Sequence, residues 1–233
     1  MTQVLNMPLP RGVVFDLDGT LIDSRADIAQ AVNHVLAWAG RPALPIETIS
    51  SFVGDGARAL VARAFGITET APEVERLFEE WQRYYLAHPV DHTVLMHGAV
   101  RALRELDARG IGVAVVTNKT RPVALSIIEA LGIASQLRGL YAGGDGPLKP
   151  HPKSIVIMAQ ALQIHTSELW VIGDGTQDIE AAHAAGAKAI AIAGGFHSEA
   201  TLRAAKPDAC FESLEAFIDA FPPRVNDRHR ADA

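Results

Sequence analysis

The sequence predicts an α/β fold with an inserted helical part, and three observations lead to this prediction. Short apolar, β-branched runs alternate with helical patterns along most of the chain, which is typical of a parallel sheet with helices on its faces. Several of these runs end abruptly in polar residues, as buried parallel strands do. After the first run, only helical patterns follow for a long stretch. We therefore expect a Rossmann-like α/β core at residues 1–22 and 94–222, an all-helical cap domain at residues 23–93, and a disordered tail at residues 223–233.

The first strand is the apolar run at residues 13–15, and it leads directly into Asp16, Asp18 and Gly19. Strand ends of this kind are where open α/β sheets bind their ligands. Gly19 favours a turn at this point. Two neighbouring carboxylates repel each other unless a divalent cation lies beside them, and Mg2+ is the hard cation that carboxylates and substrate phosphates share. The segment therefore predicts a magnesium site.

The remaining elements follow from periodicity and from the glycines and prolines that interrupt it. Residues 21–23 are expected to be a plain connector. In the cap we expect helices at residues 24–39, 46–52, 58–65 and 72–86. In the core we expect strands at residues 112–117, 140–142, 169–173, 187–192 and 208–211. Core helices are expected at residues 98–109, 121–131, 152–162, 178–185, 198–205 and 213–221.

Polar residues follow three of these strands where each strand ends. The first strand leads into Asp16 and Asp18; the other two lead into Thr117 with Asn118, and Asp174 with Asp178. Because parallel strands share their carboxyl edge, these side chains are expected to meet there. Lys149, placed between two prolines after the short strand near Tyr141, would supply the cation that such a carboxylate and phosphate cluster needs.

The bulk composition limits the classes of function. With 48% hydrophobic and 21% charged residues, the chain can bury a sizeable core. A net charge of −6 and the absence of a Lys or Arg block argue against nucleic-acid binding. The single cysteine, Cys210, excludes an internal disulfide and a cysteine-rich metal site. Residues 1–10 show no signal peptide or membrane span, so we expect a cytoplasmic protein without a membrane partner. We expect it to be a monomer or homodimer.

Four motifs in order resemble the signature motifs of the haloacid dehalogenase-like hydrolase superfamily: DLDGT at residues 16–20, TN at 117–118, KPHP at 149–152 and GDGTQD at 173–178. The resemblance runs from residue 13 to about residue 221. It implies a Mg2+-dependent phosphomonoesterase in which Asp16 attacks phosphorus to form an aspartyl-phosphate. Asp18 would act as general acid and base.

The same resemblance implies the other site residues. Mg2+ would be held by the side chains of Asp16, Asp174 and Asp178 and by the carbonyl of Asp18. Thr117 and Asn118, together with the turn at Gly19, would bind the phosphoryl oxygens, and Lys149 would offset their charge and position Asp16. The last motif carries Gly175 where the family often has serine.

The expected cap would cover the sheet edge and select the leaving group of a small phosphorylated metabolite. Residues 52–60 are similar to the cap loop and helix of phosphoglycolate phosphatases, which makes 2-phosphoglycolate the leading substrate. Gly54 would let the loop approach closely, and Arg58 would meet the substrate carboxylate. Two positions depart from that group, His97 where proline is usual and Asp55 where asparagine is common.

Other functions remain open at this point. A phosphatase of another small ester, such as a sugar phosphate, nucleotide or pyrophosphate, and a sugar phosphomutase would use the same motifs. A phospho-acceptor signalling module groups similar residues without catalysing turnover. Asp18 argues against a haloacid dehalogenase, and residues 1–91 contain no lysine for the imine of a phosphonate hydrolase.

Overall fold

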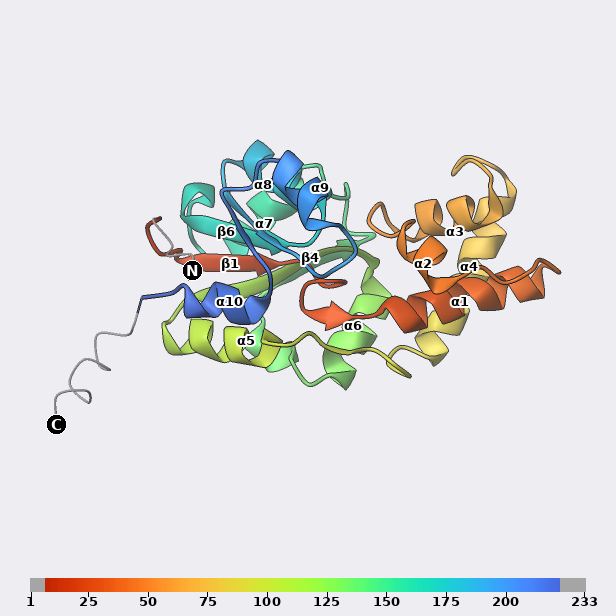
Figure 1. Ribbon diagram of the computed structural model, residues 1–233, viewed down its shortest axis with the longest axis horizontal. Coiled ribbons are helices and arrows are strands. Elements are labelled where there is room, and N and C mark those ends of the chain that lie inside the picture. The colour runs from red at the N-terminus through yellow and green to blue at the C-terminus, as the bar shows by residue number, and fades with distance from the viewer. Residues whose placement is uncertain (1–6, 223–233) are drawn as a thin grey trace.

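Six parallel strands form the central sheet of the computed structural model, which describes residues 7–222 (Figure 1). Their order is β5-β4-β1-β6-β7-β8, so β1 lies in the middle of the sheet between β4 and β6. The strands span Gly12–Phe15 (β1), Gly112–Thr120 (β4), Leu140–Gly143 (β5), Leu169–Gly173 (β6), Lys188–Ile192 (β7) and Ala209–Phe211 (β8). The expected α/β class is confirmed.

Helices cover both faces of this sheet (Figure 1). One face carries α5 (Ala99–Ala108), α6 (Arg121–Ala130) and α10 (Leu214–Asp219), and the other carries α7 (Lys153–Ala161), α8 (Thr176–Ala185) and α9 (Glu199–Ala204). Two short 3-10 turns lie at Ala134–Gln136 and Thr166–Glu168. Because side chains alternate along a strand, β1 buries Val13 and Phe15 in one hydrophobic layer and Val14 in the other.

Between β1 and the rest of the sheet, the chain forms a separate group of four helices at one end of the molecule (Figure 1). These are α1 (Arg25–Trp38), α2 (Ile46–Ser50), α3 (Ala57–Phe65) and α4 (Glu73–Ala87). The largest side chains that α4 buries are Trp81 and Tyr85. The group occupies the place of the expected cap, and we keep that name for α1 to α4.

The expectation of a plain connector at residues 21–23 was wrong. Ile22–Asp23 forms a short strand, β2, which pairs antiparallel with Val94–Leu95, β3. This two-stranded ribbon joins the two chain segments that enter and leave the cap. A strand of two residues has no readable alternation, and its partner is far away in the sequence, so no local pattern could predict it.

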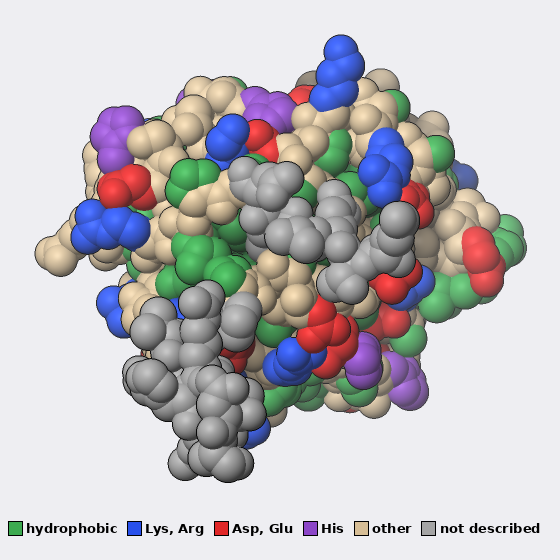
Figure 2. Space-filling view, turned by 60° about the vertical axis from the view of Figure 1, so that its left-hand side comes forward, with side chains coloured by type: hydrophobic (Ala, Val, Ile, Leu, Met, Phe, Trp, Pro, Cys, Tyr) green, Lys and Arg blue, Asp and Glu red, His purple; other side chains and the backbone are tan. Residues whose placement is uncertain are grey.

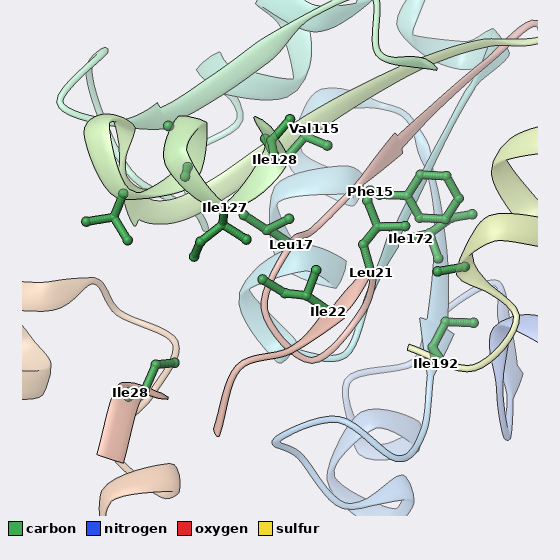
Figure 3. Close-up of a cluster of buried hydrophobic side chains, with 14 of the residues drawn as sticks. Phe15, Leu17, Leu21, Ile22, Ile28, Val115, Ile127, Ile128, Ile172 and Ile192 are labelled. Atoms are coloured by element: carbon green, nitrogen blue, oxygen red, sulfur yellow. The ribbon is translucent and has the colours of Figure 1, made fainter. Parts of the chain in front are cut away.

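The loop after β1 is fixed by apolar side chains. Phe15, Leu17, Leu21 and Ile22 are fully buried and belong to one cluster with Val115 and Ile172 (Figure 3). The carbonyl of Leu17 accepts from the N–H groups of Leu21 and Ile22, each at 3.0 Å, which closes a tight turn. With Leu17 held in the core, Asp16 and Asp18 on either side of it stay at the carboxyl end of β1.

Gly19 lies in this turn with φ of +79°, a conformation that favours glycine. A Cβ atom at this position would lie 2.3 Å from Oδ2 of Asp174, closer than any real contact. The turn can therefore approach the Asp174 carboxylate only because residue 19 has no side chain.

The surface and the ends of the chain bear on the remaining expectations. On the face shown in Figure 2, acidic and basic side chains lie interspersed, with no large basic area among the described residues. Within residues 7–222, no helix combines the length and the hydropathy that crossing a bilayer requires. Cys210 is buried and unpaired in β8. The expected tail at residues 223–233 lies outside the described residues, and the cytoplasmic location and oligomeric state stay predictions.

Candidate active site

Three carboxylates meet at the carboxyl edge of the sheet. Asp16 follows β1, Asp174 follows β6, and Asp178 lies in the first turn of α8. Each offers an oxygen atom, and these atoms lie within 4.8 Å of one another. All three residues are buried. The strand ends that the sequence predicts to converge therefore do converge.

Backbone and hydroxyl donors orient the three carboxylates. Oδ1 of Asp16 accepts from the N–H of Leu17 at 2.7 Å. Asp174 accepts from the hydroxyl of Thr20 at 2.9 Å and from the N–H of Phe196 at 2.7 Å. Asp178 accepts from the N–H of Gly175 at 3.0 Å.

Lys149 is the cation of this cluster. Its Nζ lies 2.8 Å from Asp16 Oδ1 and 2.7 Å from Asp178 Oδ1, and it donates to the carbonyl of Val116 at 2.9 Å. The side chain is only 1% exposed. Asn118 fixes the loop that carries the lysine, because its side chain accepts from Lys149 N–H at 2.8 Å and donates to Lys149 C=O at 3.0 Å.

The cluster is short of positive charge. Burial, with the charge of Asp178 beside it, raises the pKa of Asp174 to about 7, and burial raises the pKa of Asp16 well above its usual range. Although burial opposes it, the charges of Asp16 and Asp178 raise the pKa of Lys149. When all three carboxylates are ionised, as metal ligands must be, the single ammonium leaves two negative charges in excess. The possible ligand atoms are all carboxylate oxygens, and this set with its excess negative charge fits a hard divalent cation.

Asp18 lies apart from this cluster and is held by different partners. Its Oδ1 accepts from the hydroxyl of Ser24 at 2.5 Å, and Lys119 Nζ lies 2.9 Å from Oδ1 and 3.0 Å from Oδ2. Ser24 is the N-cap residue of α1, yet its side chain makes no capping hydrogen bond. The Asp18 carboxylate thus joins the β1 loop to α1 and to β4.

A pocket opens between the sheet edge and the cap. Asp16, Asp18 and Asp174 line its core side, and Thr117, Asn118 and Gly54 also line it. The cap side is lined by Ile28, Leu60 and Trp81 from α1, α3 and α4.

Two expected substrate contacts differ from the structure. Both amide hydrogens of Asn118 are engaged, one by Lys149 C=O and one by Gly54 C=O at 2.8 Å, so its side chain holds loops together rather than offering donors to a phosphoryl group. Arg58 does not line the pocket that contains Asp16. It pairs with Glu75 at 2.8 Å and stacks over the ring of Phe78 at 4.1 Å, with half of its side chain exposed.

The sequence interpretation missed several polar residues at this site. Thr20 and Ser24 orient Asp174 and Asp18, and Lys119 pairs with Asp18. Trp81 and His197 line the pocket from α4 and from the loop after β7. Lys119 follows Thr117 and Asn118 directly, in the last residues of β4, and its place after these two polar residues is a signal that the sequence offers for it.

The model of the haloacid dehalogenase-like hydrolase family matches residues 13–192 of the chain, which is more than half of it. The chain belongs to this family. The match begins at β1 and ends at β7, so the cap and the Asp16, Asp174 and Lys149 cluster all lie inside it. The family resemblance of the four sequence motifs is confirmed.

Individual relatives of this haloacid dehalogenase-like hydrolase share a name. The phosphoglycolate phosphatase of Chromobacterium violaceum is 36% identical over 86% of this chain and 92% of its own, and that of Pectobacterium atrosepticum is 33% identical over 91% of each. A solved structure, titled as a predicted phosphoglycolate phosphatase from Haemophilus somnus, superposes with a TM-score of 0.83 at 26% identity, over 92% of this chain and 99% of that one. The expected enzyme class, a phosphoric monoester hydrolase, is confirmed.

Proposed function

We propose that this enzyme is a Mg2+-dependent phosphomonoesterase that acts through an aspartyl-phosphate on Asp16 and that prefers 2-phosphoglycolate. The observation that supports it most is the buried cluster of Asp16, Asp174 and Asp178 around Lys149, of which Asp16 and Asp174 line the pocket between the sheet edge and the cap. The relatives named phosphoglycolate phosphatase support the choice of substrate.

The residues present fit Mg2+, which the side chains of Asp16, Asp174 and Asp178 and the backbone carbonyl of Asp18 would hold. When bound, Mg2+ would offset the charge of the phosphoryl oxygens and keep Asp16 ionised. Lys149 holds the Asp16 carboxylate in place at 2.8 Å. Gly19 lies against the Asp174 carboxylate and Thr117 lines the pocket, and we assign both to the phosphoryl group.

The proposed reaction has two steps. In the first, an oxygen of Asp16 bonds to phosphorus as the bond from phosphorus to the ester oxygen breaks, and Asp18 gives a proton to the leaving alkoxide. In the second, Asp18 takes a proton from water as that water attacks phosphorus and the bond to Asp16 breaks. The cap excludes bulk water while the first step proceeds.

A panel of phosphate esters with Mg2+ tests this proposal. We expect kcat/KM for 2-phosphoglycolate to exceed that for glucose 6-phosphate, AMP, pyrophosphate and p-nitrophenyl phosphate by about tenfold or more, which corresponds to roughly 1.4 kcal/mol. If another ester has the highest kcat/KM, that ester replaces 2-phosphoglycolate as the proposed substrate, and the proposed reaction steps are unchanged. Phosphoryl transfer between sugar positions would indicate a phosphomutase, and no turnover of any ester would indicate a signalling module.

A further inference from the structure

A second polar cluster lies in the pocket, and the proposed two-step reaction leaves it without a task. Lys119 of β4 lines the pocket with its side chain 3% exposed. Its Nζ contacts Asp18 at 2.9 Å and donates to the hydroxyl of Tyr85 at 3.3 Å, and it lies 4.6 Å from the centroid of the Tyr85 ring. A core lysine thus joins the assigned general acid and base to the cap helix α4.

Two buried side-chain nitrogen atoms that belong to residues of this pocket have no partner. Within residues 7–222, the buried side-chain nitrogens that make no hydrogen bond are Nε1 of Trp81 and Nδ1 of His197, and both residues line this pocket. An indole N–H can only donate, so it requires an acceptor. Trp81 packs edge-on against Tyr85, with ring centroids 5.2 Å apart, which places the indole beside the ring that holds Lys119. An unpartnered donor at this depth indicates a ligand that accepts.

The charges of the pocket indicate what kind of acceptor this is. Asp16, Asp18 and Asp174 repel an anion from the core side, and Lys119 is the only lysine or arginine among the described residues that line the pocket. Lys119 contacts Asp18, the residue assigned to the leaving oxygen, so its ammonium lies where the leaving group must lie. In 2-phosphoglycolate a single carbon separates the ester oxygen from a carboxylate, which brings this anion to the same place.

We propose that Lys119 and Trp81 form the subsite for a carboxylate on the leaving group, with Lys119 as the cation, the Trp81 indole as a donor and Tyr85 as the residue that positions Lys119. This inference rests on the proposed function and identifies the groups that would give it its substrate preference. It transfers to Lys119 the task that the sequence assigns to Arg58, whose guanidinium is paired with Glu75 outside this pocket.

The experiment compares two substrates of equal length, 2-phosphoglycolate and 2-hydroxyethyl phosphate, which differ in the carboxylate. Trp81→Phe and Lys119→Met should each lower the ratio of their kcat/KM values, by about threefold or more for the indole donor and about tenfold or more for the cation. The product glycolate, used as a competitive inhibitor, should bind more weakly to both variants. Two matched controls, Trp38→Phe at an exposed tryptophan and Lys188→Met at a surface lysine, should leave ratio and inhibition unchanged.

The outcomes separate the two proposals. If the wild type prefers 2-phosphoglycolate and both variants keep that preference, the function stands and the subsite is overturned. If Lys119→Met lowers kcat/KM equally for both substrates, Lys119 is a positioning residue for Asp18 and the subsite is overturned. The subsite is also overturned if Arg58→Met alone loses the preference for 2-phosphoglycolate. If the wild type prefers a different carboxylate-bearing ester and both variants lose that preference, the subsite stands and the proposed substrate falls. If the wild type shows no preference for an ester that carries a carboxylate, both the proposed substrate and the proposed subsite are overturned. Trp81→Phe keeps the test decisive should Lys119→Met fail to fold.

Discussion

Asp16→Asn is expected to abolish turnover of every phosphate ester, with a loss of kcat on the order of 10^4-fold or more, because an amide cannot attack phosphorus. The side chain keeps its shape, so substrate binding should persist. The fold should persist as well. Burial raises the pKa of Asp16 well above normal, which means that the charged form is disfavoured in the folded protein, and a neutral side chain removes that cost.

Phosphate release and thermal unfolding, measured on the same preparation, check this result. We expect the midpoint of unfolding in metal-free buffer to stay within a few degrees of wild type. Asp219→Asn is the matched control, because the Asp219 carboxylate is half exposed and pairs with Arg101 far from the pocket. Turnover by Asp16→Asn within tenfold of wild type would remove Asp16 as the nucleophile.

Removal of divalent cations is expected to have the second large effect. Three buried carboxylates share one lysine, so the site without a metal carries excess negative charge. Chelation should reduce activity to background, and added Mg2+ should restore it. Mg2+ at about a hundred times its dissociation constant should stabilise the fold by about 2.7 kcal/mol, or roughly 5–10 °C in the midpoint of unfolding.

The metal effect should depend on pH in a defined direction. With the pKa of Asp174 at about 7 in the absence of a cation, protons compete with the metal for this carboxylate, so the apparent affinity for Mg2+ should fall as the pH drops from 8 to 6. Asp174→Asn should lose most of the stabilisation by Mg2+ at every pH. Full activity in chelator, or an undiminished shift in Asp174→Asn, would contradict the metal assignment.

The features that the sequence predicts well have strong local signals. The core strands are apolar runs, three of them with an abrupt polar end. Because the strands are parallel, Asp16, Asp174 and Thr117 come to one edge of the sheet. The cap helices are recognisable from their apolar stripes. Lys149 is marked by the prolines around it, and its Nζ lies against Asp16.

The features that sequence reasoning misses depend on packing between distant elements. Lys119 meets Tyr85 only because β4 and α4 are brought together by the fold, and no spacing in the chain records that contact. Arg58 was assigned to the substrate from its place on the cap helix, but Glu75 on the next helix is its partner. Asn118 offers two donors in the sequence, and two backbone carbonyls already occupy them.

The central claim is that the carboxylate of Asp16 accepts the phosphoryl group, and the most direct measurement is to find that group on it. Turnover of 2-phosphoglycolate by the wild-type enzyme with Mg2+ would be stopped with acid after milliseconds, and the peptides would be mapped by mass spectrometry. We expect a phosphoryl group on the peptide that contains Asp16, rising and then decaying as substrate is consumed, and none in Asp16→Asn. Steady release of phosphate with no phosphorylated peptide at any time, or with the group on another residue, would contradict the claim.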